Sequence, residues 1–123
     1  METTFAYLAV LILAGLAVFQ LLLVVGRPLG RFAWGGQHEV LPANLRAGSL
    51  ISIGLYALFA LVILAQVGLV SPGFDLPGWA IWALAAYFTL GVLMNAISRS
   101  KPERNLMTPI ALLLALVCWF LVL

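Results

Sequence analysis

The residues best suited to chemistry lie in one short stretch near position 38. His38 and Glu39 are adjacent, and a histidine–carboxylate couple can move protons in general acid–base catalysis. Their spacing does not fit a helical zinc motif, no nucleophile accompanies them, and Gly35-Gly36 lacks the lysine of a phosphate-binding loop. One histidine and one cysteine, Cys118, cannot build a metal site within one chain. We therefore expect no catalytic, cofactor-binding or metal-binding residues and no enzyme activity.

A second group of polar side chains lies near the ends of the apolar stretches and in the long connection between the first two. If these side chains meet in space, they form a polar pocket at the cytoplasmic side. The candidate members are Gln20, Gln37, His38, Glu39, Arg46, Asn95, Arg99 and Arg104. The simpler interpretation, which the sequence favours, is that such amides satisfy loop backbone groups or hydrogen-bond between helices.

The composition restricts the scaffold that can carry these side chains. Of the 123 residues, 65% are apolar and only 8% are charged. A soluble domain usually carries about 25% charged residues, which keep its surface wetted. The composition excludes a soluble globule, a disordered chain and a nucleic-acid-binding domain, so most of the surface is expected to face lipid.

Four apolar stretches each approach the ~20 residues that cross a bilayer core. They predict an all-α, single-domain bundle of four transmembrane helices over residues 1–123, with spans at about 4–25, 45–70, 78–97 and 102–123. A fourth span starting at Pro109 would be short for a crossing. The earlier start fits better, because Ser100 suits an N-cap, Glu103 the answering third position and Pro102 the first turn.

The basic residues predict the orientation of this bundle. All six lie in or beside the first and third connections, whereas the second connection, residues 71–77, carries one acid, Asp75. By the positive-inside rule both termini are outside and both basic connections are cytoplasmic. Four tryptophans suit interfacial anchoring at the span ends: Trp34, Trp79, Trp82 and Trp119.

The two halves of the chain resemble each other weakly. In each half a basic connection and a proline precede the second span, which predicts two parallel helical hairpins, although topology alone can produce such a likeness. Small residues four apart favour close helix contacts, and the candidate packing residues are Gly48, Ser52, Ala111 and Ala115. The middle of each span contains no ionisable residue, which argues against a proton-coupled pump or a voltage sensor.

The first connection is too long and too apolar to be a simple linker. Phe32, Trp34, Val40 and Leu41 would not stand in water, so this segment either lies along the headgroup layer or folds back under the bundle. Its arginines either bind anionic lipid headgroups at the inner face or, as we favour, only determine topology.

Two segments carry a resemblance to a known group of proteins. They contain Ala33-Trp34-Gly35-Gly36-Gln37-His38 with Val40-Leu41-Pro42, and Ser98-Arg99-Ser100 with Glu103-Arg104 and Met107-Thr108-Pro109. In these segments and in its four-span layout the chain resembles a family of small, uncharacterised bacterial integral membrane proteins with four helices. The resemblance implies a multi-pass protein of the cell (inner) membrane. It brings no activity, ligand or catalytic residue with it.

Three classes of function are compatible with these observations. The first, which small size and missing chemistry favour, is an accessory or interaction protein of a membrane assembly. The second is a small-solute channel or transporter, which with four helices would need to act as a homo-oligomer. A membrane-embedded enzyme is the weakest, since no catalytic constellation supports it. The expected partners are the lipid bilayer, a second copy or another membrane protein, and not a nucleic acid.

Overall fold

The computed structural model describes residues 1–73 and 76–123, so the predicted outer-loop acid, Asp75, lies outside the described residues. Over these residues the chain is all-helical, and its runs of leucine and alanine favour that conformation. The elements are α1 (Glu2–Val24), η1 (Gly30–Phe32), η2 (Trp34–Gly36), α2 (Ala43–Gln66), α3 (Ala80–Ala96) and α4 (Lys101–Val122). The predicted all-α class is confirmed.

Three helices, α1, α2 and α4, are long and apolar enough to cross a membrane, which supports a multi-pass membrane protein. The predicted span at 78–97 is longer than α3, which has 17 residues. At 1.5 Å per residue α3 covers about 26 Å, slightly less than a ~30 Å hydrocarbon core. The helix starts late because the Ala80 N–H donates to the Pro77 carbonyl and closes a turn before it.

Two glycines end the first two helices. Gly26 (φ +94°) and Gly68 (φ +80°) have left-handed backbone, which glycine adopts without steric cost. In the turn after α2, the Leu69 N–H donates back to the Leu64 carbonyl at 2.9 Å, as in a Schellman cap. The apolar pattern predicts a span as far as residue 70. The helix α2 nevertheless ends at Gln66, because the chain turns at Gly68.

The fourth helix begins at Lys101, in agreement with the earlier of the two candidate starts. Ser100 is its N-cap and accepts the Glu103 N–H at 3.4 Å, and Pro109 lies inside the helix. The return bond of a capping box is missing. The Ser100 N–H donates instead to Ser98 Oγ at 3.2 Å, which leaves the Glu103 carboxylate free to contact another element.

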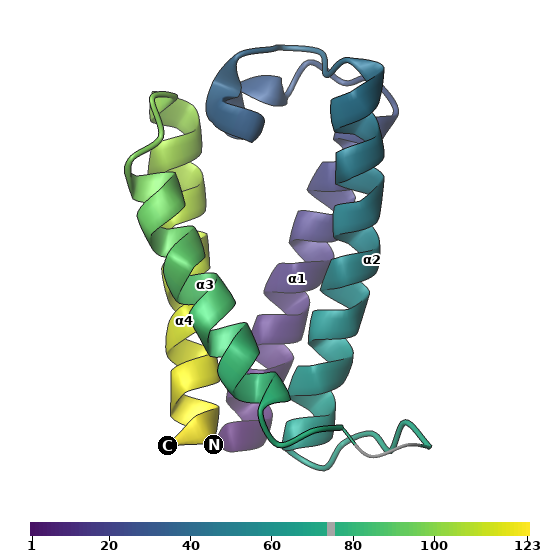
Figure 1. Cartoon of the computed structure of the whole chain (residues 1–123), viewed down its shortest axis with the longest axis vertical. Coiled ribbons are helices and arrows are strands. Elements are labelled where there is room, and N and C mark those ends of the chain that lie inside the picture. Colours follow the sequence, from purple (N-terminus) through teal and green to yellow (C-terminus); the bar gives the residue numbers. More distant parts are fainter. Residues whose placement is uncertain (74–75) are drawn as a thin grey trace.

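The helices are arranged as two hairpins, in which α1 packs most extensively against α2 and α3 against α4. Figure 1 shows both termini and the α2–α3 connection at one end of the molecule. The α1–α2 connection (loop one, residues 25–42) and the α3–α4 connection (loop three, residues 97–100) lie at the other end. We call these the terminal end and the loop-one end.

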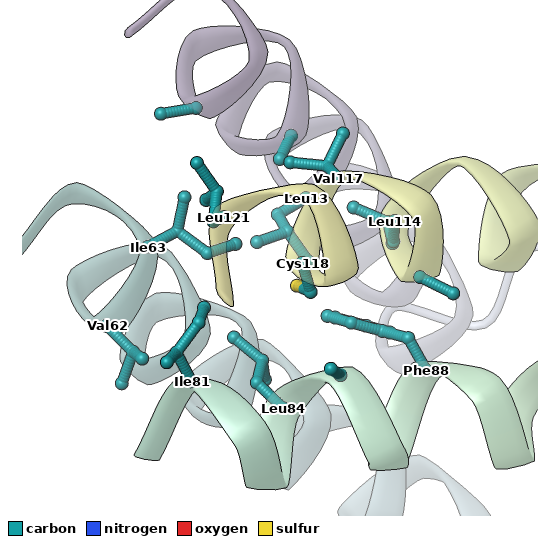
Figure 2. Close-up of a cluster of buried hydrophobic side chains, with 14 residues drawn as sticks. Leu13, Val62, Ile63, Ile81, Leu84, Phe88, Leu114, Val117, Cys118 and Leu121 are labelled. Carbon is teal, nitrogen blue, oxygen red and sulfur yellow. The ribbon is translucent and has the colours of Figure 1, made fainter. Parts of the chain in front are cut away.

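The main hydrophobic core lies between the hairpins toward the terminal end. All four helices contribute to it, and Figure 2 shows their side chains meeting around Cys118. Its fully buried members include Leu13 of α1, Ile63 of α2, Ala85 of α3 and Cys118 of α4. The hairpins are therefore held together at the terminal end, and loop one lies between them at the opposite end.

Candidate binding site

A cleft of about 370 Å³ lies between the two hairpins at the loop-one end. Its walls come from α1, α2, α3, α4 and loop one, so no single hairpin forms it. The lining is mostly apolar and aromatic, with Gln20, Asn95 and Glu103 as its amide and carboxylate groups. A largely apolar cavity with a few polar groups is the usual form of a small-molecule site.

Loop one folds back to close one side of this cleft. Ala33 and Leu41 are buried against Leu23 of α1, and the Gly30 N–H donates to the Glu39 carbonyl at 2.8 Å. The loop therefore folds back against the helices, as one of the two placements in the sequence analysis expects. This brings Phe32 and Trp34 into the lining.

Trp34 fixes the loop to α2. Its indole Nε1–H donates to the Oγ of Ser49, a fully buried residue, at 3.1 Å. The ring lies so close to Gly48 that a Cβ there would come within 2.8 Å of it. Trp34 is held in left-handed backbone (φ +53°), an uncommon conformation for a bulky residue that these contacts must maintain. Trp34 is thus a packing residue as well as a half-exposed aromatic side chain.

Glu103 fixes the same loop to α4. Its side chain is only 8% exposed, and its Oε2 accepts the Gly35 N–H at 3.0 Å. Beside it, the Ser100 hydroxyl donates to the Arg31 carbonyl. Sequence reasoning assigned Glu103 only a capping role and missed it as a site residue. The available signal was an acid in the first turn of a largely apolar helix, in a chain whose long first connection contains a glycine pair.

Gln20 and Asn95 lie on opposite hairpins and both line the cleft. Gln20 is 8% exposed, its Nε2 donates to the Tyr56 hydroxyl at 3.4 Å, and its Oε1 has no hydrogen-bond partner. Asn95 Nδ2 donates to the Gly91 carbonyl of its own helix at 2.7 Å. An unpaired buried amide atom costs free energy, but Gln20 Oε1 is itself shielded, so a molecule in the cleft would reach it only after the side chain turned.

The other members of the predicted pocket lie around the cleft rather than in it. Arg46 Nε donates to the Leu41 carbonyl at 2.9 Å, and Arg104 Nη1 to the Ser98 carbonyl at 3.5 Å, so both arginines contact connecting backbone. A smaller adjoining hollow is lined by residues that include Gln37, Asn95, Arg99 and Glu103. His38 and Glu39 are exposed and line neither hollow.

The four candidate packing residues divide into two pairs. Gly48 contacts the Trp34 ring rather than a neighbouring helix, and Ser52 Oγ donates to the Gly48 carbonyl within α2 at 3.0 Å. Ala111 and Ala115 are buried, and a Cβ on Gly91 of α3 would lie 3.9 Å from that of Ala111. The small residues of α4 are thus placed where α3 approaches.

Tryptophans at the terminal end also contact protein. The Trp119 Nε1–H donates to Thr89 Oγ1 of α3 at 2.8 Å, and the Trp82 and Trp119 rings meet edge to face, with centroids 5.8 Å apart. Across residues 1–73 and 76–123, no group of three or more histidine, cysteine or acidic side chains lies close enough to hold a metal ion.

No family model, curated protein or solved structure matches this chain.

Proposed function

We propose that this chain is a four-span protein of the bacterial cell (inner) membrane that binds a small amphipathic molecule in the cleft between its hairpins. In this proposal it is an accessory component of a membrane assembly and not an enzyme. The observation that carries the proposal is the lining itself. A mostly apolar and aromatic cleft with three amide or carboxylate side chains, Gln20, Asn95 and Glu103, suits a ligand with an apolar body and one polar group.

The proposed location in a membrane rests on the length and hydropathy of the helices and on the distribution of the basic residues. α3 is a few ångströms short of a full crossing, and a bilayer accommodates such a mismatch by local thinning. All six lysines and arginines belong to the loop-one end, which supports a cytoplasmic location for this end. They are Arg27, Arg31, Arg46, Arg99, Lys101 and Arg104. At the membrane surface the four exposed ones, Arg27, Arg31, Arg99 and Lys101, would contact anionic headgroups.

The alternative is a channel or transporter that acts as a homo-oligomer. Side chains such as Leu13, Ile63 and Cys118 fill the space between the hairpins at the terminal end. A solute path through one copy would have to cross this core, so a pore would need to form between copies. The cleft therefore favours binding over passage.

The proposal is tested by blocking the cleft. The protein is reconstituted in phosphatidylcholine nanodiscs, and retention of 4-phenylbutanol is measured by equilibrium dialysis against empty nanodiscs. Met94 lines the cleft, and Leu93, the next residue on α3, does not, although both are 59% exposed. We expect Met94→Trp to reduce retention to the level of empty nanodiscs and Leu93→Trp to leave it unchanged. Equal retention by the two variants would contradict a binding site in the cleft.

A further inference from the structure

We infer that the ligand of this cleft carries a positively charged amine head, which pairs with Glu103. The inference rests on the binding function proposed above and specifies the chemistry of the ligand. Among the described residues that line the cleft, Glu103 is the one charged side chain. A cleft that contains a carboxylate and no basic side chain is complementary to a cation.

The hydrogen bonding of Glu103 leaves room for such a partner. A carboxylate offers about four acceptor positions on its two oxygens, and the Gly35 N–H occupies one of them on Oε2. The side chain is 8% exposed, so solvent replaces the missing donors only in small part. A buried carboxylate is costly unless it is paired and hydrogen-bonded. An ammonium group supplies both a charge and three N–H donors.

The basic side chains at this end of the molecule lie outside the cleft and do not line it with Glu103. Arg104 donates to the Ser98 carbonyl and Arg46 to the Leu41 carbonyl, and neither lines the cleft. Arg99 is exposed and lines the smaller hollow beside the cleft. Arg31 and Lys101 are also exposed, and the Arg31 guanidinium lies 4.7 Å from the centroid of the Phe32 ring. None of these basic side chains lines the cleft, so its carboxylate has no basic partner within the lining.

The walls favour the same ligand. Trp34 and Phe88 contribute aromatic rings to the lining, and aromatic faces attract cations as well as apolar groups. A third ring, Phe32, already has the Arg31 guanidinium 4.7 Å from its centroid. A lipophilic primary amine would thus place its body against the aromatic walls and its head toward the Glu103 carboxylate.

The first experiment uses the unmodified protein in phosphatidylcholine nanodiscs and three probes with the same body. These are 4-phenylbutylamine, 4-phenylbutanol and 4-phenylbutyrate, with retention on empty nanodiscs subtracted. We expect the amine to bind about tenfold more tightly than the alcohol, because a charge-assisted bond exceeds a neutral one by roughly 1.4 kcal/mol. The carboxylate should bind most weakly. If the alcohol or the carboxylate matches the amine, the inference fails while the proposed binding function stands. If no probe exceeds empty nanodiscs, both fail.

The second experiment identifies the carboxylate. Glu103→Gln keeps an acceptor for the Gly35 N–H but removes the charge. We expect this variant to lose the preference for the amine while it still binds the alcohol, which also reports a folded cleft. Glu39→Gln is the matched control, because it removes an exposed carboxylate from the same end of the molecule. An amine preference that survives Glu103→Gln, or that Glu39→Gln abolishes equally, would overturn the assignment.

Discussion

Trp34 joins loop one to α2 through a hydrogen bond and a packing contact. The donor and the acceptor, Trp34 Nε1 and Ser49 Oγ, are only fifteen residues apart in the sequence, but the chain reverses direction between them. The contact also maintains the left-handed backbone at Trp34 (φ +53°). These contacts hold the Trp34 ring in the part of the cleft lining that loop one supplies.

A double-mutant cycle tests this hydrogen bond. Trp34→Phe should lower the free energy of unfolding by about 1–2 kcal/mol, because it removes the donor and leaves the buried Ser49 hydroxyl without its cross-element partner. In a Ser49→Ala background the same change should cost clearly less. Reversible unfolding in mixed detergent micelles, followed by circular dichroism, measures both values. Additive effects of the two substitutions would show that the side chains are not coupled.

At the scale of elements, a glycine on α2 has a role that its spacing did not predict. Small residues four apart favour close helix contacts, but the nearest atoms to a Cβ on Gly48 belong to the Trp34 ring, at 2.8 and 2.9 Å. By contrast, a Cβ on Gly54 of the same helix would meet nothing within 4 Å. In α2, packing against Trp34 thus requires a glycine at position 48, whereas nothing within 4 Å requires one at position 54.

These two glycines give a matched prediction. Gly48→Ala should lower the free energy of unfolding by about 1–3 kcal/mol, because the new methyl group must displace the indole ring. Gly54→Ala should be neutral or stabilise α2 by up to about 1 kcal/mol, since alanine has the higher helix propensity. The same micelle unfolding experiment compares them. A loss of stability at both positions alike would show that the ring contact at Gly48 is unimportant.

At the scale of the whole molecule, two hairpins share a core at one end and enclose a cleft at the other. The cluster around Leu13, Ile63 and Cys118 joins them at the terminal end. At the loop-one end, contact between the two hairpins is largely replaced by loop one, which bonds to α2 through Trp34 and to α4 through Glu103. The cleft therefore exists because a loop, and not a helix, separates the hairpins there.

The orientation of the whole molecule is tested by thiol labelling in intact cells. Cys118 is buried and is first replaced in a Cys118→Ala background, and single cysteines are then introduced by Arg31→Cys in loop one and Ser71→Cys in the α2–α3 connection. A membrane-impermeant maleimide should label the cysteine at position 71, and should reach position 31 only after permeabilisation, since basic loops remain cytoplasmic. The reverse labelling pattern would contradict the proposed topology.

The candidate site was only partly predictable. Gln20 and Asn95 belong to the predicted polar set and both line the cleft, whereas His38 and Glu39, which head the list of chemically capable residues, are exposed outside it. Glu103, the one charged side chain among the described residues of the lining, is predicted from the sequence only as a capping residue. Its actual partner, Gly35, is 68 residues away in the sequence. No local pattern connects two groups at that distance.

The sequence by itself determined the features that depend on neighbouring residues and on the solvent. Apolar runs produce helices long enough to cross a lipid layer, Ser100 caps α4, and the basic residues all belong to one end of the molecule. Only the tertiary structure decided how the hairpins pair, where loop one lies and which polar groups face the cleft. In an almost uniformly apolar chain many helix faces can pack equally well. The arrangement is therefore selected by a few long-range contacts, such as those of Trp34 and Glu103, that a pattern of residue types does not encode.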